Sequence, residues 1–192
     1  TFYQKKYDLA VELHGKALDI RMEHEKGNDR RKGIFLQSYN ALGESHKENG
    51  NYDQAIKFFQ KSLTHNLEKS KERGRGPSLA VARSYMNLAS VYLASSDFRE
   101  AIGLYEECLG IYFERLDSDD PILAKVFHSM GTVFNEMKNH DRAIEFFGKS
   151  LEICLVRLVP VHPFFPRIYK SFGMAYFNKG DYGKAVSFYR KS

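Results

Sequence analysis

The chain has 192 residues, of which 43% are hydrophobic and 28% charged, and its 29 Lys and Arg against 24 Asp and Glu give a net charge of +5. This composition excludes a disordered chain, and no apolar run approaches the ~18 residues of a membrane span. Two cysteines are too few for a disulfide framework. We therefore expect a cytoplasmic protein in which Cys108 and Cys154 are free, buried thiols that act as small hydrophobes.

The first 30 residues are predicted to hold the second helix of a helix pair. Tyr7-Asp8-Leu9-Ala10-Val11 matches Tyr52-Asp53-Gln54-Ala55-Ile56 further along the chain. A second-helix pattern at the start, and another that stops at Ser192, lead us to expect a fragment of a longer repeat array, because solenoids usually close with polar capping repeats.

Four further units repeat one pattern, which predicts one repeat array over residues 1–192. The expected units are a partial repeat over 1–30, repeats over 34–73, 78–117 and 121–160, and a repeat over 163–192 that is truncated in its second helix. In each unit an aromatic residue opens the first helix, Gly or Ala follows four residues later, and Ala marks the second helix. These positions are Tyr39, Tyr85, Phe127 and Tyr169; Gly43, Ala89, Gly131 and Gly173; and Ala55, Ala101, Ala143 and Ala185.

The Ala positions lie 46, 42 and 42 residues apart, and a fixed period with helical internal spacing is typical of a solenoid. Gly inside a helix costs about 1 kcal/mol relative to Ala, so these glycines predict close approach of a partner helix. The recurring aromatic residues are predicted to be core.

Turn residues separate the two helices of each unit. Asn49-Gly50-Asn51 supplies a residue for the left-handed conformation that ends a helix, and we expect Asn139 to take that position in the third full unit. Asp97 is a candidate cap for the helix that follows it. Pro160, Pro163 and Pro166 predict an extended linker before the last unit.

The units resemble the tetratricopeptide repeat, whose pattern is an aromatic residue, Leu-Gly, a further aromatic residue, and then an aromatic residue before Ala-Ile; in the first full unit His46 replaces the further aromatic residue. This chain uses Tyr or Phe where that family often has Trp. Its period exceeds the standard 34 residues, and we expect the excess to fall after the second helix. Asp119-Asp120-Pro121 and His162-Pro163 before first helices resemble the kinesin light chain type. The resemblance implies an all-α, right-handed superhelical solenoid of stacked antiparallel helix pairs.

In such a solenoid the first helices line the concave side. Carrying the family's groove-facing positions onto this sequence gives a predicted peptide-binding groove. Its residues are Gln37, Asn40, Glu44, Lys47, Arg83, Asn87, Ser90, Lys125, His128, Thr132, Asn135, Arg167, Lys170 and Asn178.

Three cations occupy one row of this groove, two residues before the opening aromatic residue: Arg83, Lys125 and Arg167. We interpret the groove as a basic, amide-lined surface for an acidic peptide segment or protein, which would make the chain an interaction scaffold. The resemblance to kinesin light chains implies a cargo-adaptor role. Lys and Arg are common on any solvated helix face, so the row is equally consistent with a surface that binds no ligand.

Other classes of function are less well supported. The seven histidines form no metal-binding spacing, and no phosphate-binding loop or nucleophile elbow is present; we therefore expect no catalytic residues, no metal and no cofactor. Nucleic-acid binding rests only on the modest charge, with no RNA-reading module. A rigid spacer in a larger assembly, or self-stacking through the ends of the array, stays an alternative.

Overall fold

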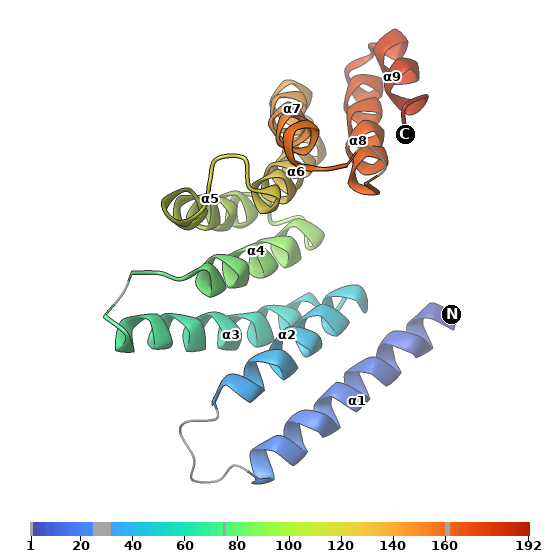
Figure 1. Ribbon diagram of the computed structural model, residues 1–192. Helices are drawn as coiled ribbons and strands as arrows, with labels where there is room; N and C mark the ends of the chain where they lie inside the picture. The colour runs from blue at the N-terminus through green and yellow to red at the C-terminus, as the bar shows by residue number, and fades with distance from the viewer. Residues whose placement is uncertain (1, 25–31, 75, 160–161) are drawn as a thin grey trace. The chain divides into compact units, whose positions relative to one another are not determined.

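The computed structural model describes residues 2–24, 32–74, 76–159 and 162–192, and every regular element in these ranges is an α-helix (Figure 1). The chain divides into two compact units, residues 1–104 and 105–192. Within the described ranges, no helix combines the length and the apolar character needed to cross a membrane.

The first unit is a series of helices, and among its first four helices each packs against the next in sequence. It contains α1 (Phe2–His24), α2 (Lys32–Glu48), α3 (Tyr52–Glu72), α4 (Leu79–Ala94) and the beginning of α5 (Phe98–Arg115). α2 contacts both α1 and α3, and α3 contacts α4. Its core lies between α3 and α4, where Ala55 and Phe59 meet Leu88 and Val91. The core forms here because each helix buries its apolar stripe on its neighbour.

The second unit, described by itself, has helices packed in a similar way. After the rest of α5 come α6 (Pro121–Glu136), α7 (His140–Arg157), α8 (Phe164–Lys179) and α9 (Tyr182–Tyr189). α7 contacts α6 and α8, α8 contacts α9, and α6 also touches α8. Antiparallel pairs joined by tight turns confirm the predicted all-α fold.

Both cysteines are free and buried, as predicted. Burial raises the pKa of the Cys108 thiol to about 12 and that of Cys154 to about 11. Because the thiolate is the reactive form, these two side chains are packing groups at neutral pH.

In three of the described helix pairs an interior glycine allows the first helix to lie directly on an aromatic ring of its second helix, whereas Ala89 holds that position in α4. A Cβ atom on Gly131 would lie 2.6 Å from the ring of Phe147, and one on Gly43 would lie 2.8 Å from that of Phe59. Gly173 meets Tyr189 in the same way, at 2.6 Å. The predicted close approach is confirmed, and the contact is made by the aromatic residue four positions after each Ala.

The turn between the helices of a pair places one residue in the left-handed region. Gly50 (φ 76°) and Gly180 (φ 87°) hold this position in two pairs, whereas Ser96 (φ 68°) and Lys138 (φ 61°) hold it in the others. The assignment of Asn139 to this position was wrong. Asn139 is instead the N-cap of α7, and its side-chain oxygen accepts a hydrogen bond of 3.2 Å from the backbone N–H of Arg142.

Two expectations about the linkers need correction. The predicted extended linker does not include Pro163 or Pro166: Pro163 is the N-cap of α8 with helical dihedrals (φ −65°, ψ −4°), and α8 begins at Phe164 and contains Pro166 in its first turn. A first-turn residue has no helical acceptor for its N–H, so proline is tolerated there. Pro160 lies outside the described residues. The excess repeat length also lies partly within the second helices, since α3 has 21 residues and α5 and α7 have 18 each.

Replacing Gly131 with Leu should destabilise the protein by about 1–3 kcal/mol or more, because the added side chain overlaps the Phe147 ring. Chemical denaturation measures the change. Gly148→Leu is the matched control: a Cβ on Gly148 has nothing within 4 Å, so the helix gains propensity and should be up to about 1 kcal/mol more stable. Equal effects of the two substitutions would contradict the proposed contact.

Replacing Lys138 with Gly should stabilise the protein by up to about 1 kcal/mol. A residue with a Cβ pays roughly 1–2 kcal/mol in the left-handed conformation, and the greater freedom of unfolded Gly offsets part of the gain. Lys138→Ala removes the same charge but keeps the Cβ. If both variants gain the same stability in denaturant titrations, the gain comes from charge and not from the backbone.

Candidate functional site

The predicted groove residues of α2 differ in exposure and in ion pairing. Gln37 and Glu44 are exposed, and Asn40 is half-buried. The Lys47 ammonium lies 2.6 Å from a Glu44 carboxylate oxygen and 3.6 Å from one of Glu48. This part of the surface therefore offers a ligand little net positive charge.

α4 carries a single cation and two small polar residues at the predicted positions. Arg83 is exposed, while Asn87 and Ser90 are half-buried. The Ser90 hydroxyl donates a hydrogen bond of 2.7 Å to the backbone carbonyl of Asn87. Since the α4 sequence has no acidic residue, Arg83 keeps an uncompensated charge along its own helix.

The predicted residues of α8 include two exposed cations. Arg167 and Lys170 are exposed, as is Lys125 on α6, and within the described part of the chain none of these three is in an ion pair. The Arg167 guanidinium lies 5.9 Å from the centre of the Phe164 ring, a cation–π distance. The α8 sequence has no acidic residue, and its remaining cation, Lys179, pairs with Asp141.

His128 is engaged in helix packing. Its ring centre lies 5.4 Å from that of Phe147 on α7 and 5.4 Å from that of Phe164 on α8, and its Nε2 lies 2.9 Å from the Ser171 hydroxyl. Burial, and then the nearby Arg167 charge, lower the pKa of His128 to about 4. The side chain therefore joins α6, α7 and α8 in its neutral form. Thr132, one turn further along α6, donates a hydrogen bond of 3.1 Å to the His128 carbonyl.

Asn135 and Asn178 are brought together in one cavity. Its volume is about 370 Å³, and the other lining residues are Glu136, Lys138, His140 and Met174. Asn135 is buried, and its side-chain oxygen lies 3.0 Å from His140 Nδ1. Asn178 is exposed and remains open to a ligand, so the two amides differ in availability although they face the same space.

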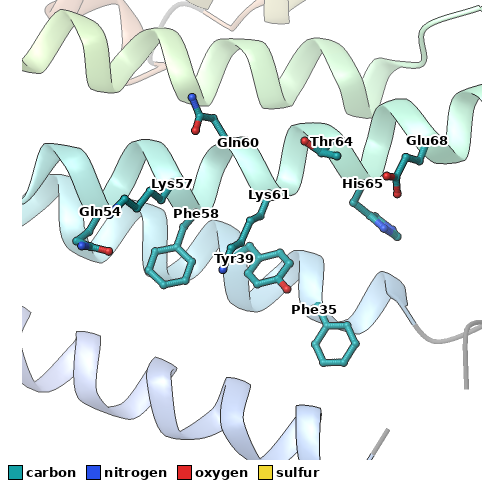
Figure 2. Close-up of a pocket in the computed structure, with 10 residues that line it drawn as sticks. All are labelled: Phe35, Tyr39, Gln54, Lys57, Phe58, Gln60, Lys61, Thr64, His65 and Glu68. Carbon is teal, nitrogen blue, oxygen red and sulfur yellow. The ribbon is translucent and has the colours of Figure 1, made fainter. Parts of the chain in front are cut away.

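A larger cavity, of about 690 Å³, lies on α2 and α3 at positions that sequence reasoning missed (Figure 2). Phe35, Tyr39 and Phe58 provide its apolar surface. The Lys61 ammonium lies 5.6 Å from the Tyr39 ring centre and 5.4 Å from that of Phe58. Gln54, Lys57, Gln60, Thr64, His65 and Glu68 complete the lining.

A signal for this contact was present in the sequence. A lysine follows the second-helix Ala by six residues at Lys61, Lys149 and Lys191. Lys149 lies 5.1 Å from the Phe146 ring centre, and Lys191 lies 5.5 Å from that of Phe188. Of these aromatic residues only Tyr39 is among those predicted to be core, and the lysines are not among the predicted groove residues.

Antiparallel helix pairs with a glycine-to-ring contact and a left-handed turn define a helical repeat protein. Comparison with protein families matches the tetratricopeptide repeat over residues 34–114, 80–155 and 122–192. The chain therefore belongs to the tetratricopeptide repeat family. A comparison with curated protein sequences gave no match.

Solved structures share the fold. BtubC (BKLC) from P. vanneervenii is 22% identical with a TM-score of 0.74, over 95% of this chain and 70% of that one. A putative kinesin light chain from Podosopora anserina with nearly identical TPR-like repeats is 20% identical, with a TM-score of 0.71 over 98% and 87%. MamA is 22% identical with a TM-score of 0.58, over 96% and 85%. The predicted kinesin light chain-like repeat type is thus confirmed in the fold.

The lowered pKa of His128 predicts a loss of stability in mild acid. The neutral side chain contributes fully above the unfolded-state pKa of about 6.5, and this contribution falls as the pH approaches the folded-state pKa of about 4. Between pH 7 and pH 5 the loss from this group should be about 2 kcal/mol. Urea titrations of the native protein and of His128→Gln measure it; an identical pH dependence in both would contradict the prediction.

Proposed function

We propose that the chain is a protein-interaction module whose first-helix surfaces bind an acidic peptide segment. Tetratricopeptide repeats generally mediate protein–protein interaction or scaffolding and are generally not enzymes. A role as a scaffold or cargo adaptor in the cytoplasm follows from this proposal.

The observation that carries the acidic preference is the absence of compensating charge on α8. Arg167 and Lys170 share this helix with no acidic residue, and the remaining cation, Lys179, pairs with Asp141 of α7. By contrast, α5 carries an excess of acidic residues: Glu100, Glu106, Glu107 and Glu114 against Arg99 and Arg115. Two first helices, α4 and α8, therefore carry cations with no acidic residue of their own, and an acidic ligand there gains long-range attraction and correct orientation.

Polar and small groups beside these cations support recognition of an extended segment. Asn178 and Lys170 are exposed on α8, and Ser90 and Asn87 lie beside Arg83 on α4. Side-chain amides both donate and accept hydrogen bonds, so they can pair with the backbone of a peptide, while the cations meet its carboxylates. Each unit presents its own set of these groups.

The test is isothermal calorimetry with a panel of acidic peptides and counterparts in which Gln and Asn replace Glu and Asp. We expect acidic peptides to bind the native protein and to lose about tenfold or more in affinity to Arg83→Glu/Lys125→Glu/Arg167→Glu. Lys69→Glu/Arg99→Glu/Arg115→Glu changes the net charge equally, on exposed second-helix positions, and should bind as the native protein does.

Other outcomes distinguish the remaining functions. Binding that survives reversal of the first-helix cations would contradict the proposed surface and favour the α2–α3 cavity. Nucleic acid that binds with a steep inverse dependence on salt would favour the nucleic-acid alternative. Absence of binding across the panel would favour the rigid spacer.

A further inference from the structure

The connection between α3 and α4 carries a basic sequence that leads directly to a serine. Residues 73–78 read Arg-Gly-Arg-Gly-Pro-Ser, so Ser78 has Arg75 three positions before it and Arg73 five positions before it. No other Ser or Thr of the sequence has arginine at both of these positions. Protein kinases select substrates by charge patterns of this kind, because carboxylates in the substrate groove of the kinase pair with the arginines. Arg75 lies outside the described residues and counts here by its place in the sequence alone.

The described part of this connection is accessible (Figure 1). Residues 73–74 and 76–77 are exposed, and Leu79, which follows the serine, is 41% exposed. The Ser78 backbone is extended, with φ −92° and ψ 166°, as in peptide segments that lie in a groove. Ser78 is half-buried, and its hydroxyl accepts a hydrogen bond of 3.2 Å from that of Ser70. The acceptor hydroxyl is therefore held at the surface by a hydrogen bond that is easily exchanged.

A second serine in the chain provides an internal comparison. Ser118 also has an arginine three positions before it, Arg115, but Asp117 and Asp119 stand on either side of it. These carboxylates repel the acidic groove of a kinase that selects arginine. Ser78 is thus distinguished from Ser118 by the charge of its neighbours.

We propose that Ser78 is a phosphorylation site for a protein kinase that recognises arginine-rich substrates. In this reaction the Ser78 Oγ bonds to the γ-phosphorus of ATP, the bond from that phosphorus to the bridging oxygen of ADP breaks, and the hydroxyl proton passes to the kinase. The sequence and the exposure of the connection carry the site, and they do not depend on the function proposed for the first-helix surfaces.

The place of Ser78 in the fold gives the phosphate a defined effect. Ser78 is the N-cap of α4, its side chain makes no capping hydrogen bond, and the first turn of α4 has no acidic residue. The Leu79 and Ala80 amides, at the start of the helix, have no acceptor within it. A phosphate carries a charge of about −1.5 to −2 at pH 7 and three acceptor oxygens. It therefore accepts hydrogen bonds from these amides and interacts favourably with the helix dipole.

Another first helix, α6, already has an anion at this position. Its N-cap is Asp120, whose side-chain oxygen accepts a hydrogen bond of 2.9 Å from the backbone N–H of Ile122. The Asp120 backbone is extended (φ −62°, ψ 131°), as is that of Ser78. Phosphorylation would give α4 the capping anion that α6 has from its sequence.

The charges at the end of α3 also favour the phosphate. Lys69, Lys71 and Arg73 lie there with Glu68 and Glu72, which leaves a net positive charge. The last carbonyl groups of a helix repel an anion, and this positive charge offsets the repulsion.

The test is incubation of the 192-residue protein with protein kinase B, which selects arginine-rich substrates, and Mg-ATP. We expect one phosphoryl group per chain, assigned to Ser78 by tandem mass spectrometry, and none on Ser78→Ala. Arg73→Gln/Arg75→Gln should lower the rate by about tenfold or more, because the charge pairs with the kinase are lost. Lys69→Gln/Lys71→Gln is the matched control: it removes the same charge from exposed positions before the connection and should leave the rate unchanged.

Hydrogen exchange followed by NMR measures the effect on α4. The Leu79 and Ala80 amides should exchange about fivefold more slowly in the phosphorylated protein, and a phosphatase should restore the original rates. The Ile122 amide, which is already bonded to Asp120, is the control and should not change.

Four results would overturn the proposal. They are no phosphoryl group on Ser78 of the folded protein, preferential modification of Ser118, equal rates for the two double variants, or unchanged exchange of the Leu79 and Ala80 amides. A peptide of residues 71–82 separates the causes of the first result, because modification of the peptide alone would show that the fold blocks the kinase. Circular dichroism melts check that each variant is folded.

Discussion

Three of the described helix pairs depend on the contact of a glycine on the first helix with an aromatic ring on the second. Gly131 lies on Phe147, and the same contact joins Gly43 to Phe59. A ring this close to the backbone of the other helix leaves no space for a methyl group, so the pair has one register in which it can pack. Gly in the first helix lowers its helix propensity relative to Ala. Burial of the aromatic ring on the second helix offsets this loss of stability, and Phe147 is only 1% exposed.

Two cations of α7 have acidic partners close by. Lys149 pairs with Glu145 of the same helix at 2.7 Å, and Arg157 pairs with Asp119, before α6, at 2.5 Å. α8 has no acidic partner of its own for Arg167 and Lys170. Exposed ion pairs add little to stability, so the importance of this arrangement lies in the field that each surface presents to a ligand.

Predictions from the sequence were correct where the local backbone conformation selects one residue type. They were wrong where packing by other helices decides the role of a residue. Gly50 was correctly placed in the left-handed turn, but the same position in a later pair is Lys138, and Asn139 became a cap. Asn suits both a left-handed turn and an N-cap, and the position at which the preceding helix ends decides which of these roles Asn139 takes. His128 matched a groove position by spacing, whereas packing from α7 and α8 encloses it and lowers its pKa.

The sequence alone determined the repeat, its helix pairs, the positions of close contact and the family, because all of these depend on spacing within about 40 residues along the chain. Tertiary structure decided which side chains are available. Asn135 and Asn178 share a cavity although only Asn178 is exposed, and Tyr189 is open while Phe59 and Phe147 are covered. Whether a side chain is exposed depends on which residues of the neighbouring helix pack over it. The spacing of residues within one repeat does not specify this packing between helices.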